Sequence, residues 1–384
     1  MKKIKIGIIG VGNCASSLVQ GIEYYKNNRS DKPVGVMHKE LGGYSVSDIE
    51  VGFAVDIDER KVGKDLSEAV YALPNCTAKI VQELKSTGVR VTMGAVLDGV
   101  SGHTQQYDEK LRVVISREKE TSMNELVHAI KKSGVEMLVN YLPVGSREAA
   151  YFYAECAIRA QVGFINCMPV FIASDDKWIQ RFREGNVPCI GDDIKSQLGA
   201  TIIHRELIRL FEERGIRLTH TYQLNTGGNT DFLNMLNRNR LFDKRISKTM
   251  AVQTNLTNQL DNRDIHVGPS DYVQWQKDNK VCFLRIEGRQ FGDIPMELEL
   301  RLSVEDSPNS AGVVIDAIRC MRIALDRGMS GDIVEPSTYF MKHPRIQQED
   351  FYGRKLLEQF IKEEAVCLQK LSAAEGDYNG KTSI

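Results

Sequence analysis

The 384-residue sequence has no long hydrophobic run. A membrane-spanning helix needs about 18 or more consecutive apolar residues, and no stretch approaches that length. The short apolar stretch after the basic start is interrupted by Gly7, Gly10 and Gly12, so we do not interpret it as a signal peptide. These absences argue against an integral membrane protein, and we expect a cytoplasmic one with no membrane partner.

Metal-binding patterns are also missing. The eight cysteines are scattered without a CxxC pair, and the seven histidines form no HxxxH or HExxH motif. Free thiols in a reducing compartment are the interpretation that this spacing favours. We therefore predict no metal ligands.

Neither sign of charge dominates. There are 50 Lys and Arg residues against 51 Asp and Glu residues, a net charge of -1. The lack of a basic surplus argues against a nucleic-acid partner. The hydrophobic share of 42% and the charged share of 26% are those of a globular protein. At roughly 150 residues per domain, the length allows two to three domains.

Strand and helix patterns alternate as far as about residue 195. A polar segment, Asn27 to Asp48, interrupts the alternation and indicates an insertion. Such alternation predicts a parallel sheet covered by helices. The expected strands are Lys3–Ile9, Glu50–Val55, Val89–Leu97, Val135–Leu142 and Val162–Cys167, and the expected helices begin at Asn13 and span Arg147–Gln161.

The pattern changes after residue 199. A helix is expected over Ala200–Glu213, and strands with polar alternation over Arg217–Leu224 and Val281–Leu302. That alternation is typical of an antiparallel sheet with one covered face. An amphipathic helix follows at Ala311–Arg327. We predict an α/β protein with a doubly wound domain over 1–199, an inserted α+β domain over 200–305, and a C-terminal segment, 306–384, that packs back on the first domain.

A G-x-G-x-x-A turn, Gly10 to Ala15, lies between the first expected strand and helix. Gly10 makes the turn, Gly12 lets the backbone approach a pyrophosphate, and the small Ala15 lets the helix pack closely. Asp56 ends the second strand, where a carboxylate accepts hydrogen bonds from a ribose 2′-OH and repels a 2′-phosphate. These features predict a Rossmann-type domain that binds NAD rather than NADP. The alternative is a glycine turn without a nucleotide.

Four polar segments look unlike core or ordinary surface. They are Gly191–Gln197, Asn225–Asp231, Arg238–Lys248 and Tyr339–Pro344. Taken singly, each has an ordinary interpretation: a helix cap, a solvated basic face, or a surface lysine among aromatic residues. Lysines that converge on one pocket depress each other's pKa, act as acids or bases near neutral pH, and hold anions while charged.

The order of these motifs resembles the myo-inositol-1-phosphate synthase (inositol-3-phosphate synthase) family in its shorter bacterial form. The likeness runs through nearly the whole chain, in IGIIGVGNCASSLVQG, VNYLPVGS, GDDIKSQLGATI, QLNTGGNTDFLNM, KRISKT, VEDSPNSAGVVIDAIR and YFMKHP. It implies a Rossmann domain with an inserted catalytic and tetramerisation domain, and hence a homotetramer. It also implies NAD-dependent, redox-neutral cyclisation of glucose 6-phosphate to an inositol phosphate, within inositol and phospholipid biosynthesis.

The resemblance also implies roles for individual residues. Ser196, Gln197, Gly228 and Asn229 would hold the substrate phosphate, with Lys248 as counter-charge. Whether a monovalent or divalent cation lies near that phosphate is left open. The implied cofactor contacts are Gly10, Gly12, Asn13, Cys14, Ala15, Asp56, Asn140, Leu142, Pro143 and Asp193.

The implied catalytic residues are mostly lysines. Lys244 would take and return the proton of the hydroxyl being oxidised, and Lys342 would stabilise the aldehyde oxygen as it becomes an alkoxide. Asp193 would lie near the nicotinamide, Asp306 would support the proton relay, and Lys248 would act beside them.

Two departures from the family pattern stand out. A lysine expected in a GDSK segment is absent where this chain has Gly292-Asp293-Ile294-Pro295, and Arg285 or Arg289 is our candidate for the missing charge. The family's KSGQT is here KSQLGAT, which leaves the counterpart of Gln197 uncertain by a residue or two. Two rival functions stay open: an ordinary NAD-dependent polyol or sugar dehydrogenase, and a non-catalytic nucleotide-binding protein.

Overall fold

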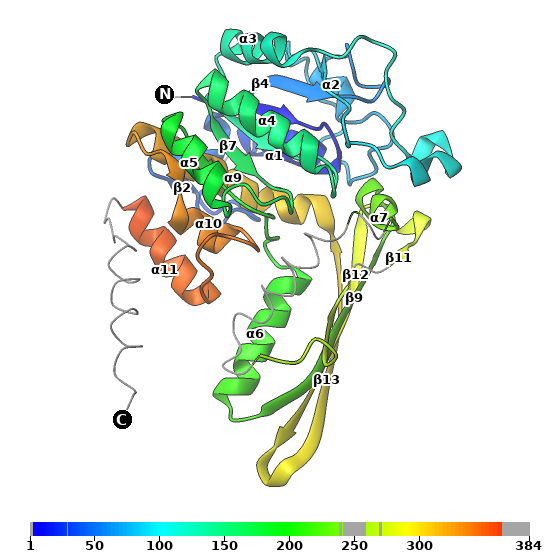
Figure 1. Ribbon diagram of the computed structural model, residues 1–384, viewed down its shortest axis with the longest axis vertical. Coiled ribbons are helices and arrows are strands. Elements are labelled where there is room, and N and C mark those ends of the chain that lie inside the picture. Colours follow the sequence, from blue (N-terminus) through cyan, green and yellow to red (C-terminus); the bar gives the residue numbers. More distant parts are fainter. Residues whose placement is uncertain (1–2, 29, 238–239, 241–258, 269–270, 363–384) are drawn as a thin grey trace.

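The computed structural model describes residues 3–28, 30–237, 240, 259–268 and 271–362. Figure 1 shows an upper layered body and, below it, a long hairpin with one helix alongside. Each body is built on its own sheet, and residues of both bodies line the pocket described below.

The first sheet has seven strands in the order β14-β8-β7-β6-β1-β4-β5, and neighbouring strands are parallel. Its central strands are short runs of buried residues, as expected when helices cover both faces. The strands are β1 (Ile4–Ile9), β4 (Ile49–Asp56), β5 (Thr92–Met93), β6 (Met137–Asn140), β7 (Gly163–Asn166), β8 (Pro188–Ile190) and β14 (Gly331–Asp332).

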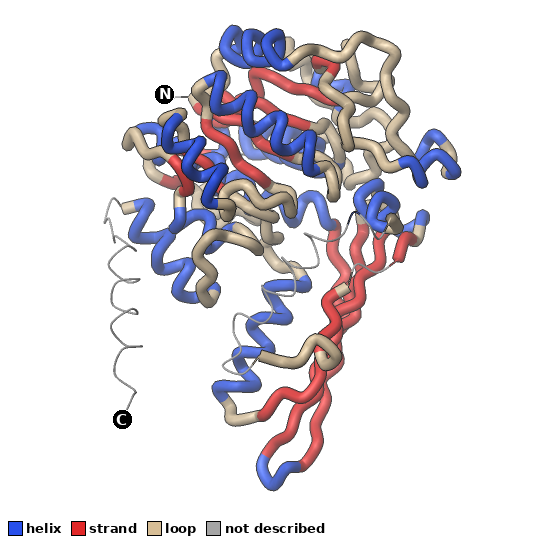
Figure 2. Tube along the Cα trace, viewed as in Figure 1, coloured by secondary structure: helices blue, strands red, loops and turns tan. Residues whose placement is uncertain are grey.

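Helices cover both faces of this sheet (Figure 1). One face packs against α1 (Asn13–Asn27), α9 (Asp306–Asp326), α10 (Val334–Phe340) and α11 (Asp350–Ile361). The other face packs against α3 (Met123–Ser133), α4 (Arg147–Ala160) and α5 (Asp176–Glu184). Between β4 and α3 the chain is mostly loop, with the short helix α2 (Leu66–Ala69), as Figure 2 shows in tan.

The second sheet is formed by the chain between β8 and α9. Its path is β10-β9-β12-β13, and β11 also pairs with β9. The long strands are antiparallel, and α6 packs over one face through Ile208 and Phe211. The elements are α6 (Ala200–Glu213), β9 (Arg217–Gly227), α7 (Thr230–Met235), β10 (Ile265–Val267), β11 (Asp271–Tyr272), β12 (Asn279–Gln290) and β13 (Ile294–Glu305).

The chain returns to the first sheet through α9. This 21-residue helix begins at the end of β13, and its residues contribute to the core of the first body. The α/β fold with a Rossmann-like parallel sheet is therefore confirmed. The limits 1–199, 200–305 and 306–384 stay a prediction.

Several expected elements differ in their bounds, and the strand at β5 and the helix α9 illustrate why. The strand expected over Val89–Leu97 is reduced to β5, because Gly63 and Leu66 donate backbone hydrogen bonds to Val91 and Val89. These bonds use backbone groups that a longer strand would pair with β4. The helix expected from Ala311 begins at Asp306 instead. Pro308 is tolerated there because the first turn of a helix needs no N–H from that residue.

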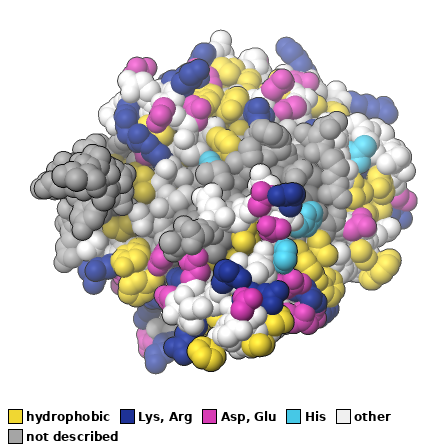
Figure 3. Space-filling view, turned by 60° about the horizontal axis from the view of Figure 1, so that its bottom comes forward, with side chains coloured by type: hydrophobic (Ala, Val, Ile, Leu, Met, Phe, Trp, Pro, Cys, Tyr) yellow, Lys and Arg dark blue, Asp and Glu magenta, His cyan; other side chains and the backbone are white. Residues whose placement is uncertain are grey.

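The face of the second sheet away from α6 is apolar only in part. Phe283 pairs with Leu224 and is 44% exposed, but the neighbouring Arg285 forms ion pairs with Glu297 and Glu299. Seen from the hairpin end, basic, acidic and hydrophobic side chains are intermixed (Figure 3). The homotetramer that the family resemblance implies stays a prediction. Within the described ranges, no helix is long and apolar enough to span a bilayer.

A charged cluster fastens the 27–48 insertion to the first body. The insertion carries the two-stranded sheet of β2 (Glu40–Leu41) and β3 (Tyr44–Ser45). His38 Nδ1 lies 2.5 Å from the buried Asp316 of α9, and its Nε2 lies 3.1 Å from Glu358 of α11. The hydrogen bond to Asp316 raises the pKa of His38, although burial opposes the shift.

We expect this cluster to make stability depend on pH. Because the folded-state pKa of His38 exceeds its ordinary value of 6.5, the stabilisation is complete below that value and is lost as pH rises through the folded pKa. The unfolding temperature should fall as pH rises above about 6.5, and His38→Gln should flatten that decline. His128→Gln, on the exposed side of α3, is the control. Equal slopes for wild type and His38→Gln in thermal scans would contradict the assignment.

Candidate active site

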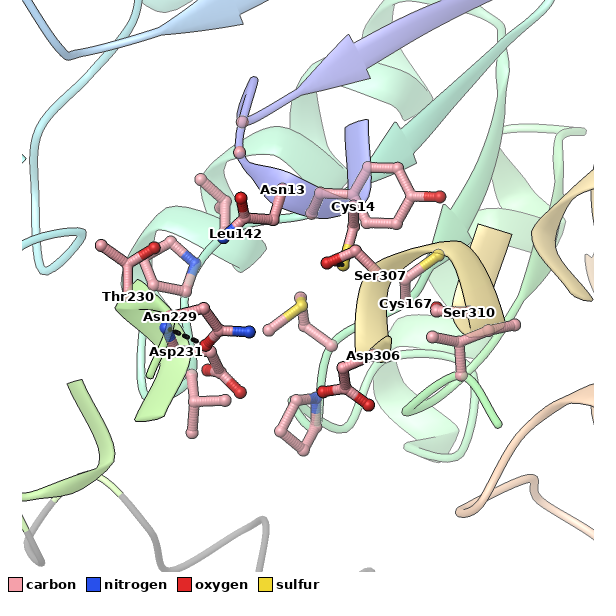
Figure 4. A pocket seen from close by; sticks show the side chains of 18 of the residues that line it. Asn13, Cys14, Leu142, Cys167, Asn229, Thr230, Asp231, Asp306, Ser307 and Ser310 are labelled. Carbon is pink, nitrogen blue, oxygen red and sulfur yellow. Dashed lines mark hydrogen bonds between the residues drawn. The ribbon is translucent and has the colours of Figure 1, made fainter. Parts of the chain in front are cut away.

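One pocket is lined by residues of both sheets. The segments that follow β1, β4, β6, β7 and β8 line it, together with residues of α7, β12 and α9. Figure 4 shows Asn229 and Asp231 on one side, Asp306 and Ser307 on the other, and Cys14 near Ser307. Ligands of open α/β sheets bind at these carboxyl ends of the strands.

The glycine turn has the geometry that a dinucleotide needs. Gly10 has φ +86°, and a Cβ at this position would lie 2.9 Å from the backbone oxygen of Tyr141. A Cβ at Gly12 would have no heavy atom within 4 Å, although Gly12 lines the pocket. Gly12 also caps the N-terminus of α1, where free N–H groups and the helix dipole favour an anion.

Asp56 contacts this turn. Its Oδ2 accepts a hydrogen bond from Val11 N at 2.7 Å, and its Oδ1 accepts from the backbone N–H groups of Ile57 and Asp58. A carboxylate oxygen has two lone pairs, so Oδ2 has one position left for a ligand hydroxyl. Asp56 lines the pocket, as its expected contact with a ribose requires.

The described residues fit a bound NAD. An open space lies over Gly12 beside a helix N-terminus, and a carboxylate with an unused lone pair lies next to it. Most of the expected cofactor contacts line the pocket: Gly10, Gly12, Asn13, Cys14, Asp56, Leu142, Pro143 and Asp193. Ala15 and Asn140 lie behind the lining. Ala15 packs in the core, and Asn140 accepts a hydrogen bond from Leu142 N and donates one to Asn166.

Lys342 and Asp193 meet because two short segments pair. Ile194 forms an antiparallel bridge with Met341, and Lys342 N donates to the backbone oxygen of Asp193 at 2.7 Å. Lys342 Nζ donates to Asp193 Oδ1 at 2.8 Å and to the backbone oxygen of Ile194 at 2.7 Å. The structure thus brings two of the expected catalytic residues together at the pocket wall.

Two buried neighbours support this pair. The fully buried Asp192 accepts hydrogen bonds from Asn166, Ser174 and the backbone of 172–174, and burial raises its pKa to about 6. Lys195 Nζ lies 2.7 Å from Asp350 of α11. Burial lowers the pKa of Lys195 to about 8, although Asp350 opposes the shift. Lys195 stood in a motif that we identified, but its distant partner carried no sequence signal.

Lys280 is a pocket lysine that the sequence analysis missed. It lies on β12, and its Nζ is 3.1 Å from Asp306 Oδ1, at the first residue of α9. Burial would lower the pKa of Lys280, but the Asp306 carboxylate outweighs that effect and raises it. The signal that could have found it is strand alternation. Lys280 lies two residues before Cys282 and four before Leu284, so all three share the covered face of the sheet.

The arginines that we considered for the missing charge lie elsewhere. Arg285 pairs with Glu287, Glu297 and Glu299 on the uncovered face of the sheet. Arg289 Nη1 donates to the backbone oxygen of Asp293 near the hairpin tip. Neither lines the pocket, whereas Lys280 does.

The expected phosphate-binding residues are only partly brought together. Ser196 and Asn229 line the pocket. The Asn229 side chain caps α7 and also donates to the buried Asp278 at 2.9 Å. Gly228 is packed against the backbone, and its N–H donates to Lys277. Gln197 is directed away, with its Nε2 donating to the backbone oxygen of Gly35.

Some expectations fall outside the described residues. Lys244 and Lys248 belong to the segment 241–258, so the structure does not place them. In the part of the chain that is described, His, Cys, Asp and Glu form no group of three or more that is arranged to hold a metal ion.

Substitution of Gly10 should mainly lower stability, whereas substitution of Gly12 should mainly weaken NAD binding. Gly10→Ala should destabilise the fold by about 1–3 kcal/mol, because it combines a positive φ with a close contact. Gly12→Val should cost only about 1 kcal/mol of stability yet weaken NAD binding by at least about tenfold, because its side chain fills the pocket. Calorimetry and thermal unfolding measure the two effects. Gly21→Ala, in open space on the same helix, is the control, and unchanged NAD binding by Gly12→Val would refute this placement.

Comparison with known proteins agrees with the motifs. The family model for myo-inositol-1-phosphate synthase matches residues 199–307. The inositol-3-phosphate synthase of Mycobacterium tuberculosis is 50% identical over 360 residues, covering 94% of this chain and 96% of the relative. That of Mycolicibacterium smegmatis is 50% identical over 364 residues, covering 94% and 98%.

A solved structure supports the fold. A myo-inositol-1-phosphate synthase-related protein from Thermotoga maritima superposes with a TM-score of 0.77 at 23% identity, covering 94% of this chain and 98% of that chain. Identity of 50% across nearly the whole length goes well beyond a shared fold, and the chain belongs to the myo-inositol-1-phosphate synthase family.

Proposed function

We propose that the protein is an inositol-3-phosphate synthase, an isomerase that converts D-glucose 6-phosphate to 1D-myo-inositol 3-phosphate. The reaction consists of oxidation, enolisation, intramolecular aldol closure and reduction. NAD, when bound, supplies the oxidation and the matching reduction, so no net reduced cofactor is released. The observation that carries this proposal is one pocket that combines the glycine turn with lysines held on carboxylates.

Lysines suit this chemistry because its intermediates carry negative charge on oxygen. Preorganised cations in a desolvated pocket stabilise such charge strongly. Lys342 has three ammonium donors, of which two are used by Asp193 and Ile194 O. The third is available to the aldehyde oxygen as it becomes an alkoxide, which is the role that we assign to Lys342.

Lys280 is our candidate to replace the lysine of the family's GDSK segment, which this chain lacks. Because Asp306 holds its ammonium and raises its pKa, Lys280 carries its charge at neutral pH. That charge suits electrostatic stabilisation of an oxyanion better than proton abstraction. Asp306, at the first residue of α9, is itself stabilised by the helix dipole.

The remaining roles rest on family resemblance. Lys244 is proposed to take and return the proton of the oxidised hydroxyl, with Lys248 as counter-charge to the phosphate. Ser196 and Asn229 line the pocket and stay candidates for the phosphate. Gln197 and Gly228 are weaker candidates, because their donors bind Gly35 and Lys277. An anchored phosphate would fold the open chain so that its reacting carbons meet, an entropic gain of several kcal/mol.

Assembly, location and ion requirement are also part of the proposal. A homotetramer and a cytoplasmic location are expected by likeness to the family. The same applies to a place in inositol and phospholipid biosynthesis. A cation beside the substrate phosphate stays open.

A redox-neutral assay separates the proposed function from its rivals. With glucose 6-phosphate and NAD, inositol phosphate should form while the near-ultraviolet absorbance of free reduced NAD stays flat. A dehydrogenase would release reduced NAD with each turnover, and a binding protein would give no product. Lys342→Ala should still oxidise the substrate but stall before cyclisation, so reduced cofactor accumulates on the enzyme. Lys355→Ala, an exposed lysine of α11, should behave as wild type.

The choice between Lys280 and Arg285 is testable in the same assay. Lys280→Met should lower kcat by about a hundredfold or more, because a pocket cation is lost. Arg285→Gln should keep kcat within about twofold, because its ion pairs lie on the partly exposed outer face of the sheet. Steady-state kinetics on both variants measures this contrast, and the reverse order would show that Lys280 is not the replacement.

A further inference from the structure

The backbone of Val11, the middle residue of the glycine turn, is held by side chains from outside the turn. Val11 N donates to Asp56 Oδ2 at 2.7 Å. Val11 O accepts from Lys61 Nζ at 2.8 Å and from Asn75 Nδ2 at 3.1 Å. Both backbone polar groups of Val11 are therefore fixed, and the conformation of the turn depends on Lys61 and Asn75 as well as on its glycines.

Lys61 is unusual among these partners because it is a buried charge. Its side chain is 3% exposed, yet Lys61 lines the pocket next to Asp56, Pro74 and Asn75. Burying an ammonium is costly unless it is paired and hydrogen-bonded. The nearest carboxylate oxygen, Asp56 Oδ2, is 3.9 Å away, which is an ion pair but is too long for a hydrogen bond.

The donors of Lys61 can be counted. An ammonium has three N–H groups, and among the described residues Lys61 Nζ donates to Val11 O and Asn75 Oδ1, at 2.8 and 3.0 Å. One donor is left, beside the carboxylate oxygen that has one lone pair left. A donor and an acceptor side by side match the two hydroxyls of a ribose, one of which donates while the other accepts.

We propose that Lys61 is a positioning and specificity-determining residue for the dinucleotide. It fixes the glycine turn through Val11 O and donates its remaining N–H to the adenosine ribose, while Asp56 accepts from the neighbouring hydroxyl. This inference rests on the NAD-binding part of the proposed function. It extends that function by making cofactor choice depend on an ion pair rather than on Asp56 alone.

The ion pair has a consequence for the 2′-phosphate of NADP. Asp56 repels that phosphate, whereas the ammonium of Lys61 attracts it. The Lys61 ammonium lies 3.9 Å from Asp56 Oδ2. Asp56→Asn removes the repulsion and leaves the attraction. The loss of discrimination between NAD and NADP in that variant should then occur only while Lys61 is present. A lysine with a purely structural role would not produce this dependence.

Direct binding of NAD and NADP tests the proposal, by titration calorimetry on the purified full chain. Lys61→Met should weaken NAD binding by about tenfold or more. Asp56→Asn should lower the ratio of the NADP to the NAD dissociation constant by about tenfold, and the double variant Asp56→Asn/Lys61→Met should lose most of that change. Lys64→Met, an exposed lysine three residues further on, should bind both nucleotides as wild type does.

Each outcome decides a separate point. Wild-type NAD affinity in Lys61→Met would overturn the role of Lys61. The same conclusion would follow if Asp56→Asn and the double variant Asp56→Asn/Lys61→Met had equal ratios of the NADP to the NAD dissociation constant. If Lys61→Met does not fold by circular dichroism, Lys61→Arg replaces it. Because arginine keeps the charge, it should retain NAD binding and shift Asp56→Asn further toward NADP; failure of that shift would also overturn the role. A wild-type protein that binds no NAD would refute the proposed function instead.

Discussion

The pocket depends on a short antiparallel pairing between the chain after β8 and the chain after α10. Residues 192–195 and 340–343 exchange backbone hydrogen bonds, although almost 150 positions separate Asp193 from Lys342. β8 and β14 are neighbours at one edge of the first sheet, so the segments beyond them start close together. The pairing fixes the backbone of both segments, and the Lys342 ammonium is then held by Asp193 and Ile194 O.

Each described lysine of the pocket is paired with a carboxylate from another segment. The pairs are Lys342 with Asp193, Lys280 with Asp306, Lys195 with Asp350, and Lys61 with Asp56. A buried ammonium without such a partner would lose its proton or destabilise the fold. Pairing offsets the cost of burying these ammonium groups, and it also ties α9 and α11 to the pocket. The ion pairs that neutralise the pocket lysines therefore also hold distant segments of the chain together.

Local features were predictable from the sequence, whereas partners distant in the chain were not. The glycine turn, α1 and α6 follow from short-range patterns, and their residues lie where those patterns place them. The position of Lys280 could also have been predicted, because strand alternation puts it on the covered face of the sheet. The contact of Lys195 with Asp350, by contrast, depends on how α11 docks, and no local spacing encodes docking. Gln197 shows the converse, since a polar residue inside a recognised motif binds Gly35 instead of lining the pocket.

The position of the inserted sheet explains how one pocket serves two tasks. The chain leaves the first sheet after β8 and returns at Asp306, and both ends of the excursion line the pocket. The second sheet thus adds Lys280 and α7 opposite the glycine turn without interrupting β1, α1 or β4. A substrate between the two sheets would meet the dinucleotide on the side of the glycine turn and Lys280 on the side of the second sheet. Holding both reacting ends of one molecule in that position replaces an encounter in solution by a fixed geometry, which is the main advantage that a cyclising enzyme can offer.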